Sequence, residues 1–290
     1  METLMTATIQ SAPRTIAGAA TPPFSGLEGQ AFDAMLIEGV GGSGAGFHFE
    51  EGGCWGMAAA LYQVFVGQGF DCGMRYQPEG FVHAWLAVGE LNLDHQGHML
   101  PRAPGIVIEG MTDLFEVAGR YGVSSDEVMA DMRAALPLVE NAWYSTRVGC
   151  GETRFAATIQ ALAAEFLGKS YAASRFELND GHCDNFAGDL DARLSASVEA
   201  DGFVVENGNF QLFNADDQAI GWDWELLAKW GIAAPAGWTA DQLDRLDVGA
   251  HVWYTDSKLH YDVECPNGVA SFFDLPLFRR QLADAKARLA

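Results

Sequence analysis

Cysteine, histidine and aspartate occur in the same order and in similar motifs in both halves of this 290-residue chain. The two sets are Cys54, His83 and Asp94, followed by Cys183, His251 and Asp262. Each cysteine lies in a Gly-x-Cys-x-x-(Met/Phe)-Ala-x-x-Leu motif, each histidine lies in His-x-Trp, and 11 positions separate histidine from aspartate in both sets. In acyl transfer these residue types supply a nucleophile, its base and the group that orients the base. The repetition therefore predicts a tandem duplication with cysteine-based chemistry.

Each cysteine is predicted to begin a helix. Apolar residues recur at helical spacing from Cys54 to Val66, and again in the segment that follows Cys183. The positive end of the helix dipole lowers the pKa of a thiol, and the unpaired N–H groups of the first turn can bind an oxyanion. Both cysteines are therefore expected where a helix favours the thiolate.

The first histidine and aspartate are predicted to lie on one β-hairpin. Residues 81–88 and 91–94 alternate in hydropathy, as strands do. A two-residue turn at Gly89-Glu90 would place His83 and Asp94 on the same face of neighbouring strands, opposite or diagonal to each other.

A second hairpin is predicted near the end of the chain. Its strands are expected at residues 251–254 and 259–263. A two-residue loop at Asp256-Ser257 would set His251 directly across from Asp262.

Together these motifs resemble the transglutaminase-like branch of the papain-like cysteine superfamily. The resemblance covers roughly a third of the chain, in the segments Gly52–Gly97 (with Gly69–Tyr76 similar to the segment before that family's histidine), Gly181–Leu194 and His251–Gly268. It implies an α+β fold of two papain-like modules, each a cysteine-bearing helix packed on an antiparallel sheet, joined by a helical segment. It also implies cysteine nucleophiles, histidine bases, aspartate orienters and a thioester intermediate, with no cofactor. Peptidases, amidases, deamidases and amide-forming acyltransferases belong to such families, so we expect a protein or peptide-like amide as substrate.

The sequence departs from the family pattern before each cysteine. Many papain-like enzymes place a glutamine there to complete the oxyanion hole, whereas this chain has Glu50 and Glu51 in the first copy. Asn179 is the candidate oxyanion donor in the second copy. The cysteine-to-histidine interval is 29 positions in one copy and 68 in the other. A catalytically inactive binding or structural protein, or a phage or effector accessory protein, therefore stands as the alternative.

The segments between the motifs suggest the domain organisation. We expect a flexible tail (1–26), a first module (27–110), a helical linker (111–173) and a second module (174–290) with an insertion (201–250). Predicted helices in the linker and insertion cover residues 111–121, 125–136, 152–167, 222–227 and 239–246.

Composition narrows the function classes further. A net charge of −22 disfavours nucleic-acid backbones and anionic membranes, and no apolar run approaches the roughly 20 residues of a membrane helix. The five scattered cysteines form no CxxC pair, which indicates a reducing compartment and a cytoplasmic protein. Asp94, His95 and His98 lie in or beside a loop, and we expect no metal site there. Trp222 and Trp224 are expected to be packing residues of the insertion.

Overall fold

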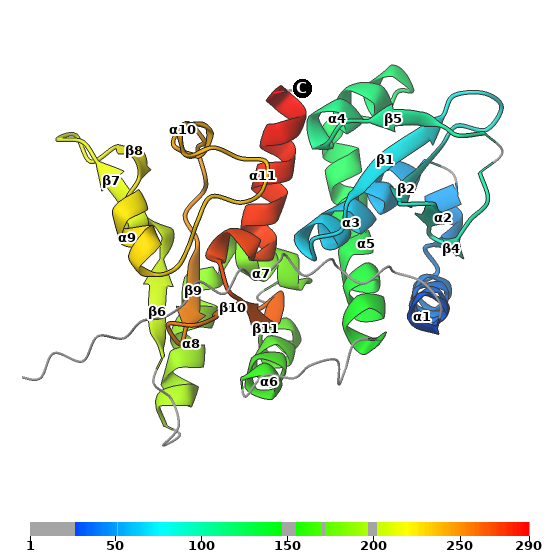
Figure 1. The fold of residues 1–290 in the computed structure, drawn as a ribbon. Coiled ribbons are helices and arrows are strands. Elements are labelled where there is room, and N and C mark those ends of the chain that lie inside the picture. Colours follow the sequence, from blue (N-terminus) through cyan, green and yellow to red (C-terminus); the bar gives the residue numbers. More distant parts are fainter. Residues whose placement is uncertain are drawn as a thin grey trace, which may run out of the picture.

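The computed structural model describes residues 27–50, 52–101, 103–146, 155–169, 172–196 and 202–289. The chain is an α+β protein whose helices pack against antiparallel sheets (Figure 1). The predicted tail at 1–26 and Cys150 lie outside the described residues.

The first half is built around one buried helix, α3 (Cys54–Gly67). All fourteen of its residues are buried, as expected for a helix that is apolar on every side. The predicted helix at Cys54 is thus confirmed. It lies between α5 on one side and a five-stranded sheet of order β4-β3-β2-β1-β5 on the other. The strands are β1 (Cys72–Gln77), β2 (His83–Val88), β3 (Leu91–Asp94), β4 (Gly97–His98) and β5 (Ile106–Ile108).

Three further helices complete this half and one follows it. They are α1 (Leu27–Ser43), α2 (Gly46–Glu50) and α4 (Met111–Arg120), then α5 (Ser125–Thr146). Helix α5 was predicted to end at Leu136, but it continues through Pro137 to Thr146, ten residues further. Its buried face packs along α3 and α1, and this contact offsets the backbone hydrogen bond that an internal proline removes.

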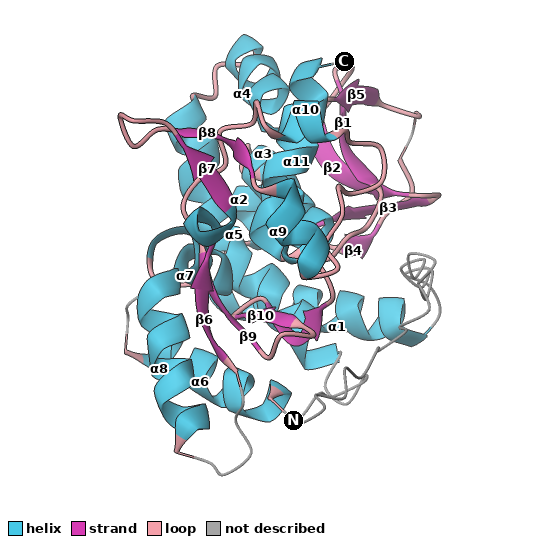
Figure 2. Ribbon diagram, turned by 60° about the vertical axis from the view of Figure 1, so that its left-hand side comes forward, coloured by secondary structure: helices cyan, strands magenta, loops and turns pink. Residues whose placement is uncertain are grey.

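The second half has its own sheet and its own cysteine-bearing helix. Helices α6 (Ala156–Gly168), α7 (Arg175–Gly181) and α8 (Cys183–Ser195) precede a sheet of order β11-β10-β9-β6. Its strands are β6 (Phe203–Glu206), β9 (Val252–Thr255), β10 (His260–Asp262) and β11 (Cys265–Val269). Strand β6 comes from the predicted insertion, so this segment supplies an edge of the sheet. In Figure 2 this sheet and the first sheet are well separated.

The rest of the insertion forms small elements beside this sheet. A 3-10 helix, η1 (Asn207–Phe210), leads into a hairpin of β7 (Gln211–Phe213) and β8 (Ala219–Trp222), followed by α9 (Trp224–Lys229) and α10 (Ala240–Leu243). Trp222 was predicted to be helical, but it ends β8, because Asp223 caps α9 through the Leu226 N–H. Thr239 is the N-cap of α10, which ends at Leu243, three residues before the end predicted from the sequence.

The C-terminal helix joins the two halves. After η2 (Phe272–Asp274), α11 (Pro276–Leu289) crosses back from the second half and packs against α3. Figure 1 shows it between the two groups of strands.

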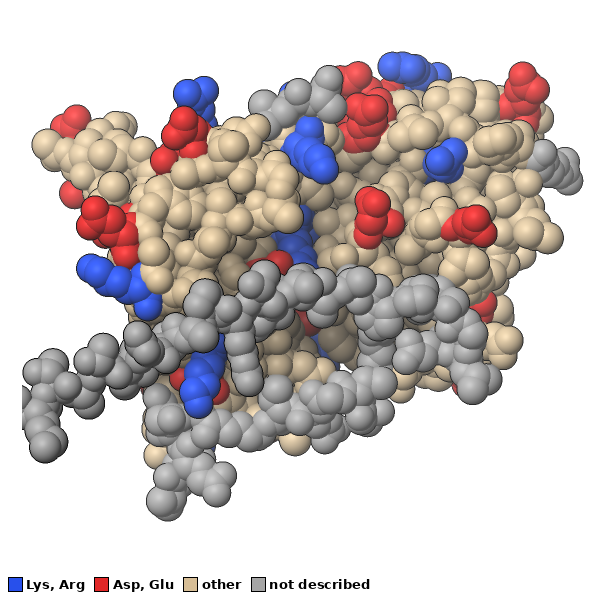
Figure 3. Space-filling model, in the orientation of Figure 1, with Lys and Arg blue, Asp and Glu red and all other residues tan. Residues whose placement is uncertain are grey.

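One face of the molecule shows how its charged side chains are distributed. Figure 3 shows Asp and Glu side chains spread over this face, interleaved with Lys and Arg, rather than gathered in one patch. Within the described ranges, no helix is long and apolar enough to cross a membrane.

Candidate active sites

Cys54 is the first residue of α3. Gly53 is the N-cap, and its carbonyl accepts the first helical hydrogen bond, from the Met57 N–H at 3.0 Å. The N–H groups of Cys54 and Trp55 therefore belong to the first turn, where a helix has no acceptors of its own to offer. These are the groups that can bind the oxyanion that forms when the sulfur of Cys54 attacks a carbonyl carbon.

His83 and Asp94 meet across the β2–β3 hairpin. The register pairs Leu86 with Leu93 and Val88 with Leu91, which confirms the two-residue turn. In this register Asp94 lies opposite Trp85 and diagonal to His83. Nε2 of His83 lies 3.0 Å from Oδ2 of Asp94.

The Asp94 carboxylate is itself fixed. It is buried, and its other oxygen, Oδ1, accepts the Gln96 backbone N–H at 2.7 Å. This contact holds the carboxylate in the orientation that receives the ring of His83.

The neighbours of His83 raise the pKa of its ring. Burial lowers its pKa, but hydrogen bonds with the side chains of Asp94 and Cys54, and the charges of the same groups, outweigh burial and raise the pKa to about 9. Since Nε2 is bound to Asp94, Nδ1 is the nitrogen that remains for the thiol. The three residues form one chain of interactions, and His83 is protonated at neutral pH.

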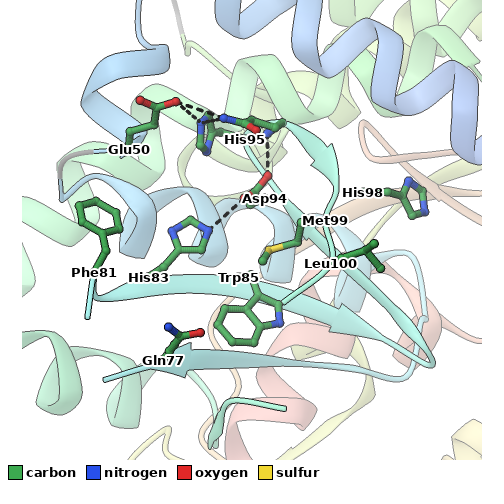
Figure 4. A pocket seen from close by; sticks show the side chains of 11 residues that line it. Glu50, Gln77, Phe81, His83, Trp85, Asp94, His95, His98, Met99 and Leu100 are labelled. Atoms are coloured by element: carbon green, nitrogen blue, oxygen red, sulfur yellow. Dashed lines mark hydrogen bonds and ion pairs between the residues drawn. The ribbon is translucent and has the colours of Figure 1, made fainter. Parts of the chain in front are cut away.

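A cavity of about 500 Å³ opens beside this group. His83 and Asp94 line it together with Glu50, His95 and Gln96 (Figure 4). Gln96 Nε2 donates to Glu50 Oε1 at 3.1 Å, and Nε2 of His95 lies 3.7 Å from the same carboxylate oxygen. The Glu50 carboxylate is thus engaged by Gln96 and His95.

Cys183 has the equivalent position in the second half. It is the first residue of α8, follows the N-cap His182 and is half-buried. Burial raises the pKa of its thiol, but the hydrogen bond and charge of His251 and the Val252 N–H outweigh burial, so that the pKa is lowered. Asp184 opposes this lowering to a smaller extent.

The second hairpin has a longer loop than predicted. The register pairs His260 with Thr255 and Tyr261 with Tyr254, which leaves four residues in the loop instead of two. The prediction that His251 faces Asp262 directly is therefore wrong. Asp262 lies opposite Trp253 and diagonal to His251, as in the first hairpin, because Asp256 accepts the N–H groups of Lys258 and Leu259 and closes a wider turn.

His251 is completely buried. Its Nε2 lies 3.2 Å from Oδ2 of Asp262, and its backbone N–H donates to Asn207 Oδ1 at 2.8 Å. Burial lowers the pKa of the ring, but the hydrogen bonds and charges of Asp262 and Cys183 raise it to about 9. The second group therefore repeats the histidine–aspartate contact of the first. It differs in that the ring is closed to solvent and its Nδ1 forms no hydrogen bond of standard geometry with the described residues.

Asn179 has a different role from the one expected. Its buried side-chain amide donates to Asp262 Oδ2 at 3.1 Å and to Glu264 Oε2 at 2.7 Å. Both amide hydrogens are therefore engaged by carboxylates, and Asn179 holds Asp262 in place instead of donating to an oxyanion.

A buried ion pair extends this network. Arg280 from α11 binds the Glu264 carboxylate with both ends of its guanidinium, at 2.8 and 2.6 Å, and the Glu264 N–H donates to Asp262 Oδ1. Gln68 from the first half and Tyr144 from α5 donate to the Glu264 carbonyl at 3.2 and 2.9 Å. Sequence reasoning missed this network, because its members are far apart in the chain and share no motif.

The structure thus brings together all six predicted cysteine, histidine and aspartate residues, in two groups of three. Among the residues described, no group of three or more His, Cys, Asp and Glu side chains is arranged to hold a metal ion. Comparisons with protein-family models, with curated proteins and with solved structures find no match to this chain.

Proposed function

We propose that this chain is a cysteine-dependent enzyme that acts on amide bonds through a thioester, built from two papain-like, transglutaminase-like modules. One observation carries the proposal: a cysteine at the first residue of a helix lies beside a histidine whose Nε2 is bound to an aspartate, and this arrangement occurs twice. Packing alone gives no reason to repeat this order of contacts through two different loops.

The first group is the one proposed to bind substrate. The side chain of His83 is 18% exposed and lines a cavity, whereas that of His251 is 0% exposed. A proton carrier must reach the leaving group, so a fully enclosed ring suits packing and a partly open one suits chemistry. We assign the second group to the architecture of the protein, with Cys183 as a reactive but non-essential thiol.

The proposed reaction has two steps. The Cys54 thiolate attacks the amide carbonyl, and the first-turn N–H groups of α3 bind the oxyanion. Protonated His83 gives its proton to the nitrogen, the C–N bond breaks, and the amine leaves a thioester on Cys54. In the second step, water or an acceptor amine attacks the thioester carbonyl while neutral His83 takes its proton. The C–S bond then breaks, which releases the acid or the new amide and returns the Cys54 thiolate.

The compartment proposed is a reducing one such as the cytoplasm. The four described cysteines form no disulfide, which suits a protein that needs free thiols.

An acylation experiment tests the proposal. We expect p-nitrophenyl acetate to release a burst of p-nitrophenol, with an acetyl thioester on Cys54 seen by mass spectrometry. Cys54→Ala and His83→Ala should remove the burst, and Cys183→Ala should leave most of it. A double variant, Cys54→Ala with Cys183→Ala, that kept the full burst would overturn the proposal.

A further inference from the structure

Two cavities share Phe81, and each has one member of the Cys54–His83 pair in its wall. One, of about 500 Å³, has His83 and Asp94 in its wall. The other, of about 350 Å³, has Cys54 in its wall, together with Trp55, Val82, Tyr121 and Val123. Phe81 lines both, so its side chain stands at the boundary between them.

Proton transfer decides which part of a substrate enters which cavity. When the tetrahedral intermediate collapses, protonated His83 must reach the leaving nitrogen. The leaving amine therefore lies on the side of His83, and the acyl group lies on the side of the cysteine. By this reasoning the cavity beside Cys54 receives the acyl substituent.

The acyl cavity is apolar and aromatic. None of its described lining residues is charged. Trp55 is buried and stacks against Tyr121, with ring centroids 6.0 Å apart and an angle of 24° between the planes. Tyr121 is 40% exposed and Phe81 is 61% exposed, so both present aromatic surface to whatever enters.

The size of this cavity suits a ring. It is open to solvent, and its volume of about 350 Å³ is more than twice the roughly 150 Å³ that holds benzene in a closed apolar cavity, so a ring has room to enter. The stacked position of Tyr121 gives an incoming ring an edge or face to pack against, which adds to the stabilisation from burial alone.

The leaving-group cavity has a mixed wall. Apolar side chains line part of it, those of Trp85, Met99 and Leu100, and the polar side chains of Glu50, His95, Gln96 and His98 line another part. Figure 4 shows Glu50, His95 and His98 arranged around this space, with Phe81 at its edge. Hydrogen-bonding groups of both kinds are available there for a polar amine.

We infer that the Cys54 site takes amides whose acyl side bears an aromatic or large apolar group and whose leaving amine is polar. The inference rests on the proposed function. The residues that set the acyl preference are Phe81 and Tyr121, which act by packing against the acyl substituent and take no part in proton transfer.

The test uses chloromethyl ketones, R–CO–CH₂Cl, on the full chain carrying Cys183→Ala. The Cys54 thiolate displaces chloride and forms a thioether, and R then occupies the acyl side. Second-order rates for R = methyl, benzyl and aminomethyl are each divided by the rate with free cysteine. We expect benzyl to react at least tenfold faster than the other two by this measure.

Two variants and a matched control assign the preference. Tyr121→Ala and Phe81→Ala should each reduce the benzyl preference several-fold and leave the methyl rate within twofold. Phe213→Ala, which removes a 49% exposed aromatic side chain on β7 in the other half, should leave the preference unchanged. Circular dichroism confirms that each variant is folded.

The outcomes separate this inference from the proposed function. If Cys54 reacts and His83→Ala slows the reaction, but benzyl has no advantage or keeps it in both variants, the subsite inference is wrong and the proposed function stands. If no ketone labels Cys54, or if His83→Ala has no effect on labelling, the proposed function itself fails.

Discussion

Asp94 lies diagonal to His83 across the β2–β3 hairpin, with 3.0 Å between Oδ2 and Nε2. Asp262 has the same relationship to His251, at 3.2 Å, although its hairpin has a four-residue loop instead of a two-residue one. The diagonal arises because aspartate pairs with the tryptophan of each His-x-Trp motif, two residues from the histidine on the same face. Two different turns thus produce one geometry.

The first prediction concerns the charge of His83. Asp94→Asn removes a carboxylate that raises the pKa of the ring and retains burial, which lowers it. We expect the pKa to fall from about 9 by roughly one to three pH units, so that the ring loses its proton near neutral pH. NMR titration of the ring nitrogens measures this directly, and the acylation rate should fall by about 10²- to 10⁴-fold.

An exposed acid provides the control for this change. Asp71→Asn alters the net charge equally, and Asp71 is exposed beside β1. The His83 titration should be the same as in the unmodified protein. An unchanged midpoint in Asp94→Asn would show that the hydrogen bond does not set the charge of the ring.

The second prediction is a pH profile for Cys183. Because alkylation follows the thiolate and the pKa of Cys183 is lowered, its iodoacetamide rate should reach its plateau at lower pH than that of an ordinary thiol. His251→Ala removes the main interactions that lower the pKa of Cys183 and leaves burial, Asp184 and the weaker effect of the Val252 N–H, so the midpoint should rise. Site-resolved mass spectrometry reads the rates.

The same experiment contains its own reference. Burial and the charge of Asp71 raise the pKa of Cys72 to about 12, so Cys72 should label slowly throughout the neutral range. Equal rates at Cys183 and Cys72 would contradict the assigned thiolate.

Local patterns in the sequence predicted the parts of each candidate site. The apolar run after Cys54 and the alternation on both sides of Gly89-Glu90 depend on contacts between near neighbours, and both elements have the predicted bounds to within two residues. The α+β class follows from the same patterns. These signals are reliable because hydropathy periodicity reports directly on which face of an element is buried.

Long-range contacts explain what could not be predicted. Asn179 looked like a free donor, but two carboxylates more than eighty positions away take both its hydrogens. The loop at Asp256 is two residues longer than predicted, because the Asp256 side chain accepts two backbone N–H groups of the loop and so favours a wider turn. Helix α5 passed Pro137 because it packs on α3 and α1. The contacts of Asn179 and of α5 lie far away in the sequence, whereas those of Asp256 are local but leave no mark in the hydropathy pattern.

The third prediction concerns the buried pair of Arg280 and Glu264. Arg280→Met leaves the Glu264 carboxylate buried without its partner, which costs about 3–5 kcal/mol of the free energy of unfolding. The combined change with Glu264→Gln should recover part of this loss. Urea denaturation of the single and double variants measures both values.

The neighbouring arginine is the matched control. Arg279 pairs with Asp274 at 3.3 Å, and both side chains are partly exposed. Arg279→Met should cost about 1 kcal/mol or less. Similar losses for the two arginines would contradict the view that burial makes the Arg280 pair critical.

The fourth prediction concerns the crossing of α3 and α5, which sets the position of Cys54. A Cβ atom added at Gly56 would lie 2.2 Å from the Cβ of Asp131 and 2.7 Å from α5 backbone atoms. Gly56→Ala must therefore push the two helices apart, and we expect the free energy of unfolding to fall by about 1–3 kcal/mol in spite of the better helix propensity of alanine.

A second helical glycine provides the control. Gly119 in α4 has no atom within 4 Å of its added Cβ, so Gly119→Ala should be neutral or stabilising by up to about 1 kcal/mol. Because α3 carries the thiol, Gly56→Ala should also slow the acylation of Cys54, whereas Gly119→Ala should not. A Gly56→Ala protein with unchanged stability would show that the two helices can separate without cost.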